Sequence, residues 1–363
     1  MKRGQQVFCT PSDHAPKIIS EWTGIYSDES RLFQGVASIA STKGNKLWAV
    51  WYGGGAGEGP ENYVMVSASS DMGRSWEKKF IIDSDVRCSG SNVWLDPTNT
   101  LWISWGQYPN GVRGPGSVNY RVLCANPDSA DAKFTAPEPF SSEVSFNKPT
   151  VLSNGRWLLQ GSIWQRTTEN SRSIYSDDQG ETFYYGADIV LTCPREFDEY
   201  MTVERNDKSV WLMTRTMDGL GEAVSYDRGE TFSPVAASEY KHITSRFHLS
   251  RLPSDRLLWI RHGYPHERLG DGPGARYNLM AFLAEDDGKT WIGGLSIDRR
   301  VGVAYPDATV VQGGTIYVIY DYDRLGEKEI LVAEITEDRI VNCDGVDTSE
   351  LLLVNKALGA TVK

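Results

Sequence analysis

The stretch Ser225-Tyr226-Asp227-Arg228-Gly229-Glu230-Thr231-Phe232 decides the fold, because its pattern occurs four times in the chain. The pattern is Ser-x-Asp-x-Gly-x-Thr followed by Trp or Phe, with Ser for Thr in the first copy and Ala for the leading Ser in the last. Asp accepts backbone N–H groups in turns, and Gly adopts a positive φ at little cost. Each copy therefore predicts a hairpin turn between two strands of one sheet. The copies lie at residues 69–76, 176–183, 225–232 and 284–291.

The spacing of these turns predicts structural repeats of similar size. The four aspartates of the pattern are 107, 49 and 59 residues apart. The first interval has room for two repeats, and a degenerate copy of the turn lies near Asn126-Pro127-Asp128. One more repeat fits after Trp291. Because repeats of about 40–60 residues are typical of β-propeller blades, we expect six of them.

We therefore predict an all-β chain folded as a six-bladed β-propeller. The counts of 35 Gly, 12 Trp and 17 Tyr agree with many turns and strands. The last blade is expected to contain strands at 316–320 and 330–333. The propeller is expected to form a single domain over residues 1–363, with residues 1–20 as an N-terminal extension that packs on it or closes it.

Charge and composition argue against several classes of partner. The net charge is −11 and no run of five or more basic residues occurs, which argues against nucleic-acid or membrane binding. No run of 18 apolar residues occurs, and the N-terminus lacks the apolar stretch of a signal peptide. We expect a cytoplasmic protein, or a trimmed form of a secreted or periplasmic one. The five cysteines are scattered without the spacing of a zinc site. The sequence implies no metal or organic cofactor.

The repeated turn is similar to the Asp-box of the sialidase superfamily and of related propellers, and the resemblance covers nearly the whole chain. It implies a sialidase-type propeller that acts as an exo-glycoside hydrolase. The expected reaction removes a terminal acidic sugar, sialic acid or a related ulosonic acid, from a glycan or oligosaccharide substrate. Active sites of this family combine a tyrosine nucleophile, a glutamate that pairs with it, an acid/base aspartate and three arginines that bind the substrate carboxylate.

The resemblance assigns the nucleophile pair to two segments. Val303-Ala304-Tyr305-Pro306-Asp307 resembles the tyrosine segment, which makes Tyr305 the expected nucleophile. Phe197-Asp198-Glu199-Tyr200-Met201 resembles the glutamate strand, so Glu199 is the expected partner, with Glu204 as the competing candidate. A tyrosine suits an anionic sugar because a carboxylate nucleophile would be repelled by the substrate's own carboxylate.

The arginines follow the family pattern only in part. Arg215 and Arg276 stand where the second and third carboxylate-binding arginines are expected, and Asp321 stands where the family carries a glutamate that orients the first. The position of the first arginine is occupied by Gln34. Arg31 lies three residues upstream, but on a strand it would point to the opposite face from Gln34.

The acid/base position also departs from the pattern, because the loop that carries the family's aspartate offers Glu58 and Glu61 instead. Either glutamate would serve as the acid if the pocket raised its pKa. Other polar side chains are expected to line the pocket, namely Arg87, Arg166, Arg246 and His262.

The missing first arginine leaves two other functions open. The pocket could accept a uronic acid and cleave it by hydrolysis or by β-elimination, since two arginines still neutralise one carboxylate. The chain could also be a sugar-binding propeller without activity, which would follow if Glu199, Tyr305 and both loop glutamates were remote from one pocket.

Overall fold

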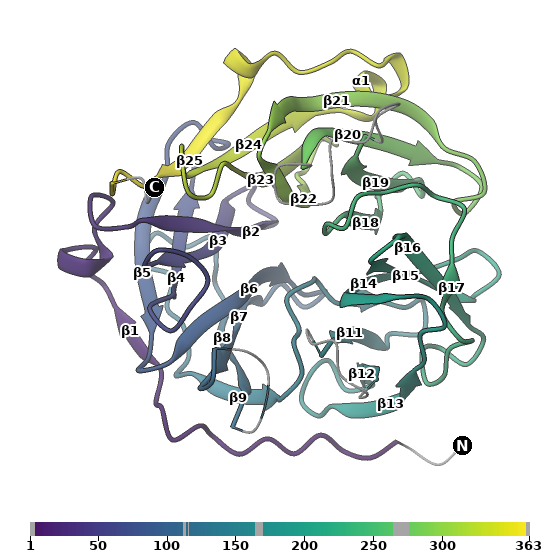
Figure 1. Cartoon of the computed structure of the whole chain (residues 1–363), viewed down its shortest axis with the longest axis horizontal. Coiled ribbons are helices and arrows are strands. Elements are labelled where there is room, and N and C mark those ends of the chain that lie inside the picture. The colour runs from purple at the N-terminus through teal and green to yellow at the C-terminus, as the bar shows by residue number, and fades with distance from the viewer. Residues whose placement is uncertain (1–3, 112–113, 115, 164–169, 264–275, 361–363) are drawn as a thin grey trace.

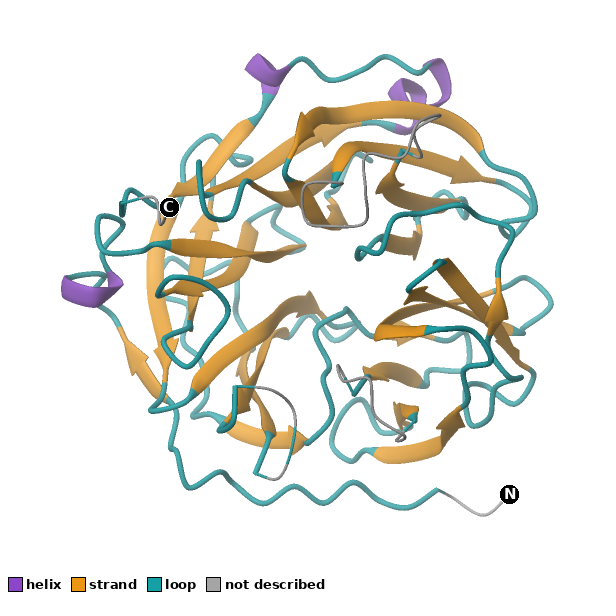
Figure 2. Cartoon of the chain, in the orientation of Figure 1, coloured by secondary structure: helices purple, strands orange, loops and turns teal. Residues whose placement is uncertain are grey.

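The computed structural model describes residues 4–111, 114, 116–163, 170–263 and 276–360. Within them, six antiparallel sheets form a ring around a central axis (Figure 1). The prediction of an all-β, six-bladed β-propeller is confirmed. Among the residues that the structure describes, helix is confined to short segments on the periphery, as Figure 2 shows.

Each blade is built from one continuous part of the chain, with its first strand nearest the axis. The first two blades contain β2 (Phe33–Ser41), β3 (Leu47–Gly54), β4 (Tyr63–Ser69) and β5 (Glu77–Asp83), then β6 (Arg87–Leu95), β7 (Leu101–Tyr108), β8 (Val118–Cys124) and β9 (Glu138–Ser141). The third and fourth contain β10 (Thr150–Val151), β11 (Trp157–Gly161), β12 (Ser171–Ser176) and β13 (Tyr184–Ile189), then β14 (Arg195–Glu204), β15 (Val210–Thr216), β16 (Gly219–Ser225) and β17 (Ala236–Ala237).

The last two blades follow the same plan. They contain β18 (His248–Arg251), β19 (Leu257–His262), β20 (Tyr277–Ala284) and β21 (Ile292–Val301), then β22 (Val303–Val310), β23 (Ile316–Tyr322), β24 (Glu329–Ile335) and β25 (Leu352–Lys356). Within the described ranges, the helical segments are α1 (Glu337–Asn342) and the 3-10 turns at Gly24–Tyr26 and Thr348–Glu350. No helix in the described ranges has the length and apolar character needed to cross a membrane.

The N-terminal segment runs along the outer edge of three blades (Figure 1). The Gln5 carbonyl accepts a 2.9 Å hydrogen bond from the backbone N–H of Tyr185 in the third blade. Further along, β1 (Lys17–Ile19) pairs with β5 and so becomes a fifth strand of the first blade. This segment therefore links blades that lie apart in the sequence.

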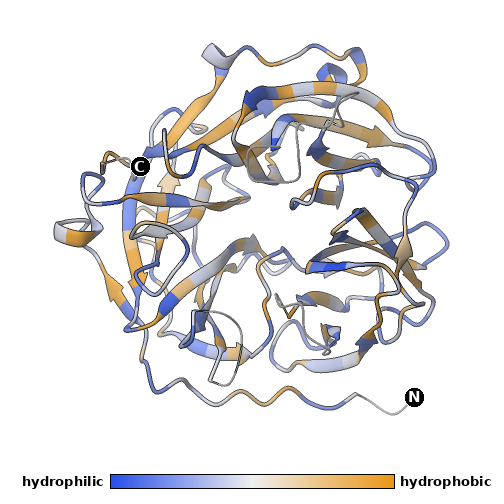
Figure 3. Ribbon diagram, viewed as in Figure 1, coloured by the Kyte–Doolittle hydropathy of each residue, from blue (hydrophilic) through white to orange (hydrophobic). Residues whose placement is uncertain are grey.

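The hydrophobic core consists of the interfaces between neighbouring blades. Figure 3 shows hydrophobic residues on strands all around the ring. Between the second and third blades, for example, the Trp94 and Trp157 rings meet edge to face with centroids 4.7 Å apart. Because each sheet is covered on both faces by its neighbours, the strands contain nearly continuous buried runs such as Leu47–Gly54.

The repeated turns join the third and fourth strands of four blades. In the third blade, the Asp178 carboxylate accepts hydrogen bonds from the Ser176 hydroxyl at 2.8 Å and from the Thr182 backbone N–H at 2.9 Å. Gly180 has φ 85°, and a Cβ on it would lie 2.5 Å from the Trp102 ring of the previous blade. The turn thus needs Gly both for its conformation and for the packing of one blade on another.

Candidate active site

A cavity of about 750 Å³ opens among the loops and strand ends at one mouth of the central axis. This volume lies within the range of small-molecule sites, about 300–1,000 Å³. Its polar lining comes from the first, second, fourth, fifth and sixth blades and includes Glu58, Arg87, Glu199, Arg215, Arg276, Tyr305 and Arg324.

Tyr305, Glu199 and Arg215 form a closed hydrogen-bonded triangle in this cavity. The Tyr305 hydroxyl donates to Glu199 Oε1 at 3.0 Å. Arg215 Nη1 donates to Glu199 Oε2 at 3.0 Å and to the Tyr305 hydroxyl at 3.2 Å. All three residues are buried. Glu204, the competing candidate for the pair, lies farther along the same strand and accepts hydrogen bonds from Ser153 instead.

The electrostatics of the triangle keep the proton on the tyrosine and the charge on the arginine. Burial, followed by the charge of Glu199, raises the pKa of Tyr305 above its ordinary value, although Arg215 and two further arginines act in the opposite direction. Burial also disfavours the Arg215 cation, but Glu199 and then Tyr305 together outweigh this effect, and the pKa of Arg215 is raised. A neutral tyrosine next to a carboxylate is the state that precedes proton transfer to that carboxylate.

Irregular backbone on the innermost strands aims these side chains at the axis. Tyr305 has φ 54°, and the pairing of β22 with β23 shifts register between Ala304 and Asp307. In β14, Phe197 and Asp198 also have positive φ, directly before Glu199. Such bulges re-aim side chains and cost conformational energy, so their presence on both partners of the pair points to a functional constraint.

Three guanidinium groups surround the Tyr305 ring. Arg215 touches its hydroxyl, the Arg276 guanidinium carbon lies 5.1 Å from the ring centroid, and that of Arg324 lies 4.2 Å from it. No carboxylate among the described residues forms an ion pair with Arg276. Burial, followed by the opposing charge effects of its neighbours, leaves the pKa of Arg276 below its ordinary value. A cluster of guanidiniums that includes one without a carboxylate partner suits an anionic ligand.

Arg324, which was not among the residues predicted to line the pocket, lies in the turn between β23 and β24. Its Nε donates to Asp321 Oδ1 at 3.0 Å. Asp321 is buried and, as expected, orients an arginine. That arginine is not in the first blade, however, but three residues after Asp321 in the last blade. The available signal was the spacing of Asp321 and Arg324 at a strand end, together with Gly35 directly after Gln34.

Glu58 lines the cavity mouth as an ion-paired carboxylate. It accepts hydrogen bonds from the Tyr52 hydroxyl at 3.0 Å, from Arg87 Nη2 at 2.8 Å and from Arg324 Nη1 at 3.4 Å. Burial acts to raise its pKa, but Arg324 and then Arg87 outweigh it, and the pKa of Glu58 is lowered. The rise in pKa that was expected for an acid is therefore absent in the free protein. Glu61 is exposed and does not line the cavity.

Residues 45–318 match the family model described as the BNR repeat-like domain. The chain belongs to the BNR repeat-like domain family. The match covers most of the chain and agrees with the repeated Asp-box turns. No curated protein sequence matches this BNR repeat-like protein.

Solved structures that superpose on the BNR repeat-like protein include sialidases. A Hadza microbial sialidase does so with a TM-score of 0.69 and 14% identity, over 87% of this chain and 68% of its own. The intramolecular trans-sialidase from Ruminococcus gnavus gives a TM-score of 0.62 and 12% identity, over 89% and 98%. The Trypanosoma rangeli sialidase in complex with sialic acid gives 0.58 and 15%, over 89% and 57%. These likenesses establish the sialidase-type propeller fold, and the predicted resemblance to the superfamily is confirmed.

Gln34 and Arg31 belong to the seam between the first and last blades of this BNR repeat-like propeller. Gln34 is fully buried; its Nε2 donates to the Lys328 carbonyl at 2.6 Å, and its Oε1 accepts from Arg31 Nε and Trp51 Nε1, both at 2.9 Å. The expectation that Arg31 points away from Gln34 is wrong, because Arg31 precedes β2 and is not on the strand. Neither residue lines the cavity.

The remaining candidates are divided between the cavity and the protein interior. Arg87 lines the cavity, where its Nη1 donates to the Gly111 carbonyl at 2.7 Å. Arg246 is buried outside it and donates to Asn147 at 2.8 Å. His262 is also buried outside it, and burial lowers its pKa to about 3. Arg166 lies outside the described residues.

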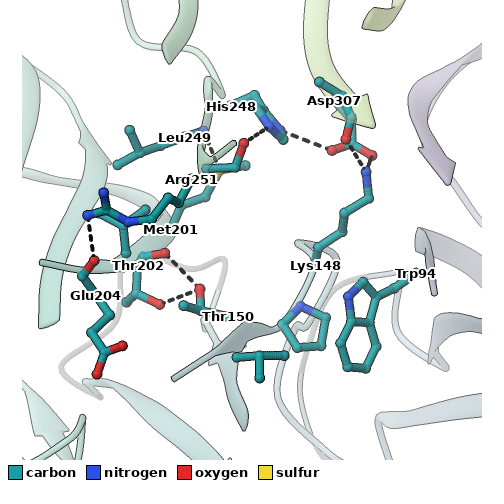
Figure 4. Close-up of a pocket in the computed structure, with 15 residues that line it drawn as sticks. Trp94, Lys148, Thr150, Met201, Thr202, Glu204, His248, Leu249, Arg251 and Asp307 are labelled. Atoms are coloured by element: carbon teal, nitrogen blue, oxygen red, sulfur yellow. Dashed lines mark hydrogen bonds and ion pairs between the residues drawn. The ribbon is translucent and has the colours of Figure 1, made fainter. Parts of the chain in front are cut away.

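A second cavity, of about 270 Å³, lies farther along the same inner strands (Figure 4). Asp307 accepts from Lys148 at 2.8 Å, from His248 at 3.1 Å and from the Ser38 hydroxyl at 2.6 Å. Burial opposes ionisation of Asp307, but Lys148 and then His248 outweigh it, and its pKa is lowered. The charged groups of this cluster are already paired with one another, so the cluster serves to hold the inner strands together around the axis. No group of His, Cys, Asp and Glu within the described ranges is arranged to hold a metal ion.

Proposed function

We propose that this protein is an exo-acting glycoside hydrolase of the sialidase type, which removes a terminal acidic sugar, sialic acid or a related ulosonic acid, from a glycan or oligosaccharide. The observation that carries the proposal is the hydrogen-bonded triangle of Tyr305, Glu199 and Arg215 in a cavity lined by four guanidinium groups. The sialidase-type fold supports it, and one similar structure was solved with sialic acid bound.

The first step forms a covalent intermediate on Tyr305. Glu199 accepts the proton of the Tyr305 hydroxyl, and the phenolic oxygen bonds to the anomeric carbon. The bond from that carbon to the glycosidic oxygen breaks, and the oxygen leaves with the electron pair and takes up a proton. Arg215 stabilises the phenolic oxygen as negative charge develops on it, because its Nη1 already lies 3.2 Å away.

The second step reverses the roles of the pair. Water bonds to the anomeric carbon and gives a proton to the carboxylate that protonated the leaving oxygen, the bond to the Tyr305 oxygen breaks, and the proton held by Glu199 returns to the phenolic oxygen. A neutral tyrosine suits this chemistry because the substrate carries its own carboxylate close to the reacting carbon, and an anionic nucleophile would be repelled by it.

Glu58 is the candidate acid for the leaving oxygen. The other carboxylates that line the cavity are Glu199, which is hydrogen-bonded to Tyr305, and Asp323, which accepts from the backbone N–H groups of its own turn. Arg324 and Arg87 lower the pKa of Glu58 in the free protein. A substrate carboxylate that binds Arg324 removes part of this effect, so substrate binding favours the protonated Glu58 that the reaction needs.

The proposal is tested by incubation with 4-methylumbelliferyl glycosides of N-acetylneuraminic acid, of a deaminated ulosonic acid and of glucuronic acid. Fluorescence from either of the first two supports it. Fluorescence from the glucuronide alone, or an unsaturated product from a uronate polymer, would replace it with a uronate-directed enzyme. Binding of the acidic sugars without release would leave a sugar-binding propeller, although the cavity that brings Tyr305, Glu199 and Glu58 together favours catalysis.

A further inference from the structure

Arg324 lies in the last blade and extends into the cavity. Its backbone contacts Gln34 in the first blade. We propose that Arg324 binds the acidic group of the substrate together with Arg215 and Arg276, and that Gly35 is required to make room for it. The inference rests on the proposed function for the identity of the acid. It adds a binding residue and a positioning residue that no motif in the sequence indicated.

The first blade holds Arg324 through its backbone. The Gln34 N–H donates to the Arg324 carbonyl at 3.3 Å. The Val36 N–H donates to Asp321 Oδ2 at 2.7 Å, and Asp321 Oδ1 accepts from Arg324 Nε at 3.0 Å. Val36 has φ 56°, which is unusual for a β-branched residue. The local strain in β2 thus serves to fix the carboxylate that orients Arg324.

Gly35 provides the space that the Arg324 side chain occupies. A Cβ at this position would lie 2.7 Å from Arg324 Nε, 2.9 Å from its Cδ and 2.9 Å from Asp321 Oδ2. These separations are too short for any side chain without displacement of the guanidinium or of its carboxylate. The absence of a side chain at 35 and the presence of an arginine at 324 are therefore parts of one arrangement.

Arg324 keeps donors available for a ligand. Its Nη2 is shielded from solvent and has no hydrogen-bond partner among the described residues. Its Nη1 contacts Glu58 only at 3.4 Å, at the long end of hydrogen-bond distances. The Arg324 guanidinium carbon lies 4.2 Å from the centroid of the Tyr305 ring. The free donors of Arg324 are therefore next to the proposed nucleophile. An anionic group bound there would satisfy a buried donor that is otherwise unpaired.

The direct test compares an acid with its neutral isostere. Isothermal titration would measure binding of the 2,3-unsaturated glycal of N-acetylneuraminic acid and of its carboxamide, with benzoate and benzamide as probes that require no sugar recognition. Removal of one charge-assisted contact in Arg324→Ala is expected to weaken binding of each acid by about tenfold or more, with little change for the amides. Equal losses for acid and amide, or no acid binding by the wild type, would overturn the inference.

Arg300→Ala is the matched control. Arg300 also pairs with a buried aspartate, Asp298, at 2.6 Å and stacks on a tyrosine ring, Tyr322, at 3.8 Å, but it does not line the cavity. The two variants therefore cause similar structural damage, and only Arg324→Ala should lose acid binding. Thermal unfolding of both variants identifies any general loss of structure. A loss of acid binding in Arg300→Ala equal to that in Arg324→Ala would contradict the assignment.

Gly35→Ala tests the positioning role without removing a charge. It is expected to reduce acid binding in the same direction as Arg324→Ala, whereas Gly59→Ala, whose Cβ would meet nothing within 4 Å, should bind like the wild type. The proposed function and the role of Arg324 can fail separately. Acid-selective loss in Arg324→Ala without any turnover of sialosides by the wild type would remove the proposed function alone, and turnover with unchanged acid binding in Arg324→Ala would remove this inference alone.

Discussion

The Tyr305 hydroxyl donates a 3.0 Å hydrogen bond to Glu199, although the two residues are 106 positions apart in the chain. They come from the sixth and fourth blades and meet where the inner strands approach the axis. Each stands at or directly after a residue with positive φ. Strained backbone of this kind is concentrated at functional sites, where it positions side chains. Here it positions a phenol and a carboxylate for proton transfer.

Replacement of either member of this pair should abolish turnover. Tyr305→Phe removes the nucleophilic oxygen and is expected to reduce kcat by at least about 1,000-fold. Glu199→Gln keeps the shape but cannot accept the proton, and is expected to cost about 100-fold or more. Initial rates on an acidic glycoside that the wild type cleaves provide the measurement.

Tyr317 and Glu334 provide the matched control for this pair. The Tyr317 hydroxyl donates to Glu334 Oε1 at 2.7 Å, and neither residue lines the cavity. Tyr317→Phe and Glu334→Gln should therefore retain the wild-type rate. Retained turnover in Tyr305→Phe would sink the covalent mechanism, even if Glu199→Gln were inactive.

Glu58→Gln should discriminate between leaving groups. If Glu58 protonates the glycosidic oxygen, its loss matters most for natural linkages, whose alcohol is a poor leaving group, and least for 4-nitrophenyl glycosides, whose phenolate leaves without a proton. We expect a loss of about 100-fold on a sialyl-lactose substrate and much less on the aryl glycoside. A uniform loss on both substrates would assign Glu58 to the support of Arg87 and Arg324 instead.

Gln34→Ala should destabilise the propeller without changing its chemistry. The substitution leaves the Lys328 carbonyl, the Trp51 N–H and the Arg31 Nε without their buried partner. The expected cost is about 2–4 kcal/mol of the free energy of unfolding, measured by denaturant titration. The specific activity of the folded protein should stay at the wild-type level; a fall in activity at unchanged stability would instead place Gln34 in substrate binding.

The blades and most of the cavity were predictable because their signals are local. The Asp-box turns repeat within a few residues each, and Glu199, Arg215, Arg276 and Tyr305 keep a fixed order relative to them. Arg324 was not predictable in this way, because its role depends on the closure of the ring, which brings the last blade against Gly35 in the first. The strand that contains Gln34, taken alone, indicated that an arginine was missing. In the closed ring, a different segment brings Arg324 to the cavity.

Acid should weaken the fold through His262. Burial lowers the pKa of this residue to about 3, whereas an unfolded histidine titrates near 6.5. As the pH falls, the unfolded chain therefore takes up a proton at His262 before the folded protein does. This lowers the free energy of unfolding at pH 5 by about 2 kcal/mol relative to pH 8. Denaturant titrations at both pH values should give a correspondingly smaller difference in His262→Gln. An identical difference in the variant and the wild type would contradict the prediction.

Two glycines with similar backbone separate conformation from packing at the Asp-box. Gly155 has φ 88° with nothing within 4 Å of an added Cβ, whereas Gly229 has φ 81° and an added Cβ would lie 2.7 Å from Leu158 of the previous blade. Gly155→Ala is expected to cost about 1–2 kcal/mol from the left-handed conformation alone. Gly229→Ala should cost about 1–3 kcal/mol more, because it also overpacks the interface between blades. Equal costs in denaturant unfolding would show that the glycine of the turn serves only its φ, and that the packing of neighbouring blades does not depend on it.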